Sequence, residues 1–79
     1  MQAFILINTD PAKAWEVADS TLKIEGVKIA HAVTGPFDVV AYAEFTKMDA
    51  LREILEKIHL VKGVIRTQTA IAMPPRLKV

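Results

Sequence analysis

Four runs of hydrophobic residues along the chain have the length and composition of β-strands. They cover residues 3–7, 27–34, 39–45 and 64–73. The first and third runs are nearly continuous, which is typical of strands covered on both faces, whereas the second and fourth carry polar or charged residues, which favours the edges of a sheet. In the second run, alternation is expected to place Val27, Ile29, His31 and Val33 on one face.

The segment between the first two runs has the period of an amphipathic helix. Asp10 followed by Pro11 has the pattern of an N-cap and of the residue best suited to the first helical position. Trp15, Val17 and Leu22 are expected to supply most of the surface that this helix buries. A glycine after the segment ends the helix.

A second amphipathic helix is predicted between the third and fourth runs. Thr46 and Asp49 have the spacing of a capping box, so the helix is expected to open there. Its apolar stripe consists of Leu51, Ile54, Leu55 and Ile58. Gly63 ends the segment.

The predicted element order, βαββαβ, favours an α+β, ferredoxin-like sandwich. In this fold, a four-stranded antiparallel sheet of order 4-1-3-2 carries both helices on one face. The two continuous runs then occupy the central positions. The second face of those central strands is also apolar, and the chain has no element left to cover it, so another subunit is expected to do so.

Composition supports one small oligomeric domain over residues 1–79, without a DNA-binding domain. A chain of 79 residues buries only about 60–65% of its extended surface when folded alone. A hydrophobic content of 52% therefore favours burial against further copies. The formal net charge of +1 comes from interspersed acids and bases, so direct DNA binding is not expected.

No leader, membrane segment or standard catalytic motif is recognisable. The first apolar run is too short for a signal peptide or a membrane span, so a cytoplasmic location is expected. The chain has no cysteine, and its two histidines, His31 and His59, lack partners at metal or dyad spacing. We therefore expect no catalytic residue, metal or cofactor, and structural or interface roles for both histidines.

The stretch between the second and third runs is the strongest candidate for a binding site. Gly35-Pro36 predicts a hairpin turn, with Asp38 directly after it. A carboxylate there can accept hydrogen bonds from an ammonium group, while turn N–H groups and the hydroxyls of Thr67 or Thr69 can donate to a carboxylate. Together these groups match the two ends of a free amino acid. The alternative is that Asp38 caps backbone and the threonines are ordinary strand residues.

Three stretches of the sequence resemble the effector-binding RAM (regulation of amino acid metabolism) domain of the Lrp/AsnC transcriptional regulators. These are Ala3-Phe4-Ile5-Leu6-Ile7, then Gly26-Val27 with Val33-Thr34-Gly35-Pro36-Phe37-Asp38, and Gly63-Val64-Ile65-Arg66-Thr67-Gln68-Thr69. They occur in the order and at the spacing of that family, and the match covers almost the whole chain.

The resemblance implies a dimeric α+β barrel with two sheets face to face, and rings of eight or ten chains. It also implies that an amino acid binds between dimers, at Thr34, Gly35, Pro36, Phe37 and Asp38 and near Thr67 and Thr69. Two departures from the family pattern stand out. The chain begins at the first strand, without the helix-turn-helix domain, and thus looks like a stand-alone RAM protein. Phe37 also replaces a common tyrosine, which removes a hydroxyl.

The resulting hypothesis is a non-enzymatic amino-acid sensor and oligomerisation module. Its expected partners are a free amino acid, further copies of the chain and full-length Lrp/AsnC regulators, with no membrane partner. Two alternatives remain open. One is a cofactor-free α+β barrel enzyme of the monooxygenase or isomerase kind, to which only His31 and Tyr42 could contribute. The other is a purely structural oligomerisation module.

Overall fold

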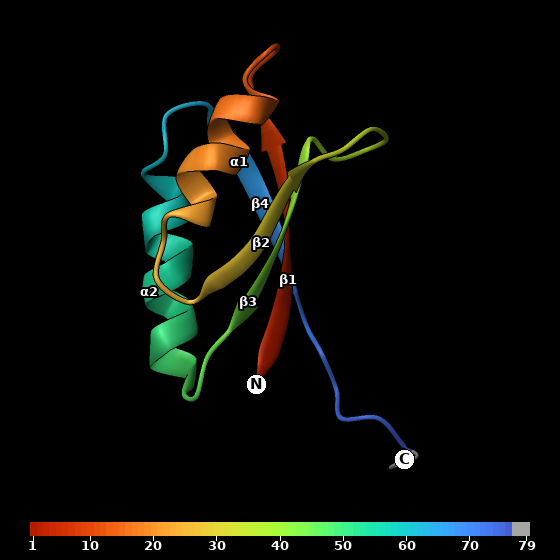
Figure 1. Ribbon diagram of the computed structural model, residues 1–79, viewed down its shortest axis with the longest axis vertical. Coiled ribbons are helices and arrows are strands. Elements are labelled where there is room, and N and C mark those ends of the chain that lie inside the picture. Colours follow the sequence, from red (N-terminus) through yellow and green to blue (C-terminus); the bar gives the residue numbers. More distant parts are fainter. Residues whose placement is uncertain (77–79) are drawn as a thin grey trace.

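A computed structural model describes residues 1–76 and shows the βαββαβ order expected from the hydrophobic pattern (Figure 1). The elements are β1 Gln2–Thr9, α1 Ala14–Leu22, β2 Val27–Ala32, β3 Val39–Glu44, α2 Met48–His59 and β4 Val64–Ile71. Among residues 1–76, no helix is both long and apolar enough to cross a membrane.

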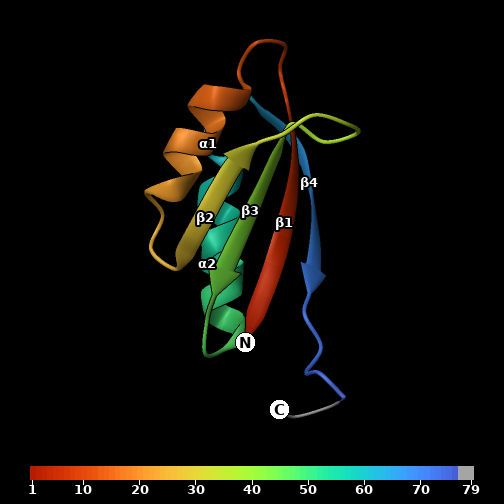
Figure 2. The ribbon, with the colours of Figure 1, turned by 45° about the vertical axis from the view of Figure 1, so that its right-hand side comes forward.

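The four strands form one antiparallel sheet in the order β2-β3-β1-β4, which confirms the predicted topology (Figure 2). β1 and β3 are central, as their continuous apolar runs indicated. The register places Ile7 of β1 beside Val39 of β3 on one side and beside Thr67 of β4 on the other. This row of residues joins the elements that carry the candidate site.

Both helices cover the same face of the sheet, and the core lies between the two layers (Figure 1). Its largest fully buried hydrophobic side chains are Ile5, Ile7, Val17, Val39 and Ile58. Each such side chain contributes about 1.5–3 kcal/mol through removal from water. The helix-facing side of β1 and β3 is therefore the part of the fold that packing determines most strongly.

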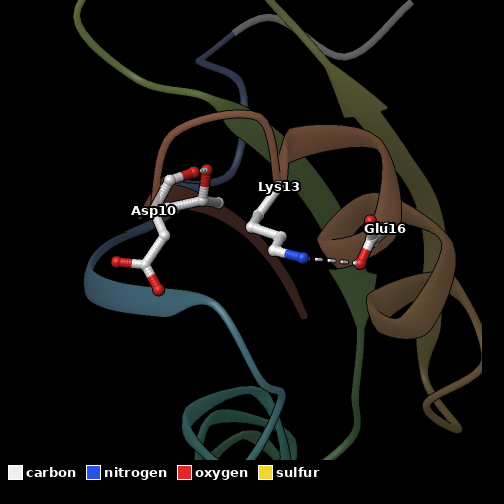
Figure 3. Close-up of polar contacts among 4 residues, drawn as sticks. Asp10, Lys13 and Glu16 are labelled. Carbon is white, nitrogen blue, oxygen red and sulfur yellow. Dashed lines mark hydrogen bonds and ion pairs between the residues drawn. The ribbon is translucent and has the colours of Figure 1, made fainter.

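The start of α1 differs from the prediction that Asp10 caps it and Pro11 opens it. The helix begins at Ala14, and its N-cap residue, Lys13, makes no side-chain capping bond. Ala12 has a φ of 64°, which interrupts the helical conformation between Pro11 and Ala14. Lys13 pairs instead with Glu16 across 3.5 Å, while the Asp10 carboxylate points elsewhere (Figure 3).

The buried stripe of α1 is also rotated from the predicted one. Val17, Ala18 and Thr21 are buried, whereas Trp15 is 76% exposed and Leu22 is 48% exposed. The small side chains on this stripe let the helix lie close to the sheet, and Trp15 and Leu22, seven residues apart, lie together beside it on the same side of the helix. The expectation that Trp15 and Leu22 supply most of the buried area was therefore wrong.

The second helix begins at Met48, and no capping box forms at Thr46 and Asp49. Its N-cap residue is Lys47, which is extended and makes no side-chain cap. Leu51, Ile54 and Ile58 are buried as predicted. Gly26 packs against this helix with a φ of 99°, and a β-carbon there would lie 2.8 Å from Ile54 Cδ1.

A register shift in β2 corrects the predicted face of that strand. The pairing with β3 shifts between Val27 and Ile29, so that Val27 is buried under the helices while Ile29 and His31 lie on the other, open face. The bulge explains why one alternating run does not keep all its apolar residues on one side. The open face holds a shallow hollow of ≈ 390 Å³, lined by Phe4, Ile29, His31, Val40 and Tyr42.

Candidate functional site

The segment between β2 and β3 is a hairpin turn that extends beyond the sheet (Figures 1 and 2). The Val33 N–H donates to the Asp38 carbonyl at 2.9 Å and closes the turn. Gly35 has a φ of 111°, a conformation that favours glycine, and, apart from its two chain neighbours, no residue has an atom within 4 Å of the place where a β-carbon would be. The predicted turn is therefore present, with its glycine backbone open to the surroundings.

Two backbone groups and one side chain of β1 fasten this turn to the body of the protein. Asp38 Oδ2 accepts a hydrogen bond from the Thr9 N–H at 2.8 Å, and the Asp38 N–H donates to the Ile7 carbonyl at 2.9 Å. Asn8 Nδ2 donates to the Pro36 carbonyl at 2.9 Å. Asp38 thus satisfies the backbone of the adjacent strand with one carboxylate oxygen. Within residues 1–76, no hydrogen bond engages its other oxygen, Oδ1.

The remaining residues of the predicted turn site differ in exposure. Thr34, Gly35 and Pro36 are exposed, whereas Phe37 and Asp38 are half-buried. The aromatic ring of Phe37 is therefore partly accessible. This arrangement can border a small apolar or amphipathic molecule at the turn.

The two predicted threonines lie on β4 in different surroundings. Thr67 is half-buried, and its Oγ1 lies 3.0 Å from Nε2 of His59, the last residue of α2. Thr69 pairs with Ile5 further along the strand and is exposed. Only Thr67 of the pair is thus linked to a neighbouring side chain in the part of the chain that the structure describes.

The structure brings Asp38 and Thr67 to the same end of the sheet but not into contact. Val39, directly after Asp38, and Thr67 both pair with Ile7, so β1 lies between them. Two strand spacings amount to roughly 10 Å. A molecule the size of an amino acid that touches both groups in one chain would have to bridge β1.

The open face carries the two side chains, His31 and Tyr42, on which the enzyme alternative depends. His31 and Tyr42 line the same hollow, but the Tyr42 hydroxyl donates to Glu44 Oε2 at 3.2 Å, and the 76 described residues contain no His31–Tyr42 hydrogen bond. Desolvation first, and then Glu44, raise the pKa of Tyr42 above its ordinary value of 10.0, so the phenol loses its proton only at more alkaline pH. In residues 1–76, no group of three or more His, Cys, Asp and Glu side chains is placed to hold a metal ion.

Two residues that hold the candidate turn in place, Asn8 and Thr9, were not predicted from the sequence. Asn8 and Thr9 act on a turn 28 and 29 residues away, and nothing in their immediate sequence signals this contact. His59 was expected to have a structural or interface role, and the structure identifies Thr67 as its hydrogen-bond partner.

Comparison with known proteins gives a consistent family match. The family model described as the Lrp/AsnC ligand binding domain matches residues 2–76. An uncharacterized HTH-type transcriptional regulator of Pyrococcus abyssi is 34% identical over 70 residues, covering 87% of this chain and 44% of the regulator. The chain spans about half the length of the curated relatives it matches.

Solved structures match along nearly the whole chain. A protein from Pyrococcus horikoshii is 33% identical with a TM-score of 0.83, and the match covers 95% of this chain and 92% of that one. A transcriptional regulator from Neisseria meningitidis, solved in complex with L-methionine, is 30% identical with a TM-score of 0.79. That match covers 98% of this chain and 52% of the regulator.

Proposed function

The chain belongs to the Lrp/AsnC ligand-binding domain family, and we propose that it is a non-enzymatic amino-acid sensor whose ligand binding is coupled to oligomerisation. The observation that carries the proposal is the fastened turn, in which Asp38 is fixed beside an open glycine backbone and uses only one carboxylate oxygen for the fold. The complex of the Neisseria relative with L-methionine supports an amino acid as the ligand class.

In the proposed site, each end of the amino acid has its own partner. Asp38 Oδ1 receives the ammonium group while Oδ2 stays on the Thr9 N–H. The Gly35 backbone and the hydroxyl of Thr67 or Thr69 hold the carboxylate. Three further turn residues, Thr34, Pro36 and Phe37, border the ligand side chain.

The proposed site lies between chains. Because β1 separates Asp38 from Thr67, the two ends of one small ligand are more simply held by groups from two copies. In this proposal, two open sheet faces pack together in a dimer and cover Phe4, Ile29 and Tyr42. Dimers then assemble into rings of eight or ten around the ligand sites, and full-length Lrp/AsnC regulators can join such rings.

The coupling between ligand binding and oligomerisation follows from mass action. A ligand that contacts two dimers binds the assembled form better than the separated one, and therefore shifts the population toward assembly. The functional output of the sensor is then the size or stability of the assembly.

Isothermal titration calorimetry with each of the twenty amino acids, with light scattering on the same samples, tests the proposal. We expect saturable binding of at least one amino acid together with larger or tighter assemblies. No binding by any amino acid, with an unchanged oligomer, would contradict the sensor and favour a structural module.

The substitution Asp38→Asn isolates the ammonium contact. Its amide oxygen can still accept the Thr9 N–H, so stability should be largely kept, while the charge is lost. A hydrogen bond to a charged group contributes about 1.5–3 kcal/mol, so affinity should fall roughly 10- to 150-fold. Asp38→Ala removes both contacts and serves as the comparison. Unchanged affinity in Asp38→Asn would refute the assigned role.

A further inference from the structure

A solvent-exposed side-chain hydrogen bond links the C-terminal end of α2 to β4, an edge strand of the sheet. His59 is the last residue of the helix, and its Nε2 lies 3.0 Å from Oγ1 of Thr67. The chain between them turns tightly: the Leu60 N–H donates to the Lys57 carbonyl at 3.2 Å, and the Val61 N–H donates to the Ile58 carbonyl at 3.0 Å. The imidazole is thus placed against β4 by a short hydrogen-bonded connection.

The chemistry of a hydroxyl makes this contact directional. A threonine hydroxyl has one hydrogen to donate and two lone pairs to accept with. If His59 Nε2 takes the hydrogen, Thr67 offers only lone pairs to a ligand. If Nε2 carries its own hydrogen and donates it to Oγ1, the Thr67 hydrogen remains available for a carboxylate.

Thr69 provides the internal comparison. It lies two residues further along β4, opposite Ile5, and is exposed. Within residues 1–76, no side-chain hydrogen bond restrains its hydroxyl. Holding a rotatable side chain in one orientation before binding lowers the entropic cost of the contact, so Thr67 is the better-prepared donor of the two.

We propose that His59 is a positioning residue of the amino-acid site: it donates Nε2–H to Thr67 Oγ1 and thereby directs the Thr67 hydroxyl hydrogen to the carboxylate of the ligand. This inference rests on the proposed function and adds to it the residue that distinguishes Thr67 from Thr69. His59 itself does not touch the ligand.

Calorimetric titration with L-methionine, or with whichever amino acid binds the unmodified protein in the panel, tests the role. His59→Leu should weaken binding about fivefold, on the scale of one net hydrogen bond. His59→Gln places an amide nitrogen near the position of Nε2 and should restore affinity to within about twofold of the unmodified protein. Thr69→Val, the matched control on the same strand, should change affinity less than Thr67→Val.

A double-mutant cycle separates positioning from general stability. If His59 acts only through Thr67, the double variant His59→Leu/Thr67→Val should bind no more weakly than Thr67→Val alone. Additive losses, or unchanged affinity in His59→Leu while Thr67→Val is weakened, would overturn the inference and leave the sensor intact. Absence of amino-acid binding by the unmodified protein would overturn both.

The direction of the bond has a readout that needs no ligand. Nitrogen-15 NMR of the imidazole distinguishes a protonated Nε2 from an unprotonated one. We expect a hydrogen on Nε2 in the unmodified protein, with its resonance altered in Thr67→Val and unaltered in Thr69→Val. An unprotonated Nε2 that accepts from Thr67 would refute the donor assignment.

Discussion

Replacing Thr21 by valine should stabilise the protein, because the hydroxyl of Thr21, on the buried side of α1, has no hydrogen-bond partner among the described residues. Thr21 is fully buried, and in the described residues its Oγ1 has no hydrogen-bond partner. Valine has nearly the same shape and replaces the hydroxyl by a methyl group. Leaving a buried hydroxyl unsatisfied costs about 1–3 kcal/mol, and a buried methyl adds under about 1 kcal/mol of favourable transfer.

The expected gain is about 1–2 kcal/mol in the free energy of unfolding, since valine and threonine differ little in helix propensity. For a domain of this size, each kcal/mol raises Tm by about 4–8 °C. Denaturation by guanidinium chloride and calorimetric melting measure the gain. Protein concentration must be fixed, because oligomerisation also raises Tm.

Two further variants make this test specific to the buried hydroxyl. Thr46→Val applies the same chemical change at an exposed position, and its stability should stay within about 0.5 kcal/mol of the unmodified protein. Thr21→Ser keeps the hydroxyl, loses a buried methyl and should destabilise. A Thr21→Val protein that is no more stable than the original would refute the reasoning and indicate that the hydroxyl bonds to a helix carbonyl or to water.

Three other perturbations have defined outcomes. Gly26→Ala should lower the free energy of unfolding by about 2 kcal/mol or more, because Gly26 has a φ of 99° and the new β-carbon would lie 2.8 Å from an isoleucine side chain of α2. Gly35→Ala, where the β-carbon would lie in open space, should lower it less. Equal losses in the two variants would contradict the steric argument. Asn8→Ala removes the bond to the Pro36 carbonyl, so amide hydrogen exchange in the turn should accelerate while that in α2 stays unchanged. Exchange in the turn at the same rate as in the unmodified protein would show that Asn8 does not restrain the turn. The raised pKa of Tyr42 means that the folded protein keeps this proton longer than the unfolded chain, so stability should decline as pH rises above about 10; Tyr42→Phe should reduce that decline, and an identical alkaline profile would exclude the effect.

The strand order could be predicted from the sequence because a strand's position in the sheet determines how many of its residues are apolar. The central strands are apolar on both faces, and the edge strands carry polar residues, so the order could be predicted without contacts. The helix starts were not predictable by the same means. The Asp10 N–H bonds to the Gly63 carbonyl at 2.8 Å, a tertiary contact that takes the segment around Pro11 out of the helix.

The candidate site was only partly predictable for a related reason. A turn is a local feature, so Gly35-Pro36 could be recognised from two residues. The partners that hold Asp38 and Thr67 come from β1 and α2, and a one-residue shift in β2 changed which side chains face the open side. Such features depend on register across strands, which hydrophobic alternation does not specify.

The pairing of β1 with β4 has a consequence for how the protein is made. Ala3 pairs with Ile71, so one edge of β1 stays unpaired until β4 has also been synthesised. At a synthesis rate of about 5–20 residues per second, this delay is roughly 3–14 s. Throughout that interval an apolar strand has an unpaired edge, the arrangement most prone to wrong pairing between nascent chains. β1 is therefore a central strand of the folded domain but an edge strand until β4 has been synthesised.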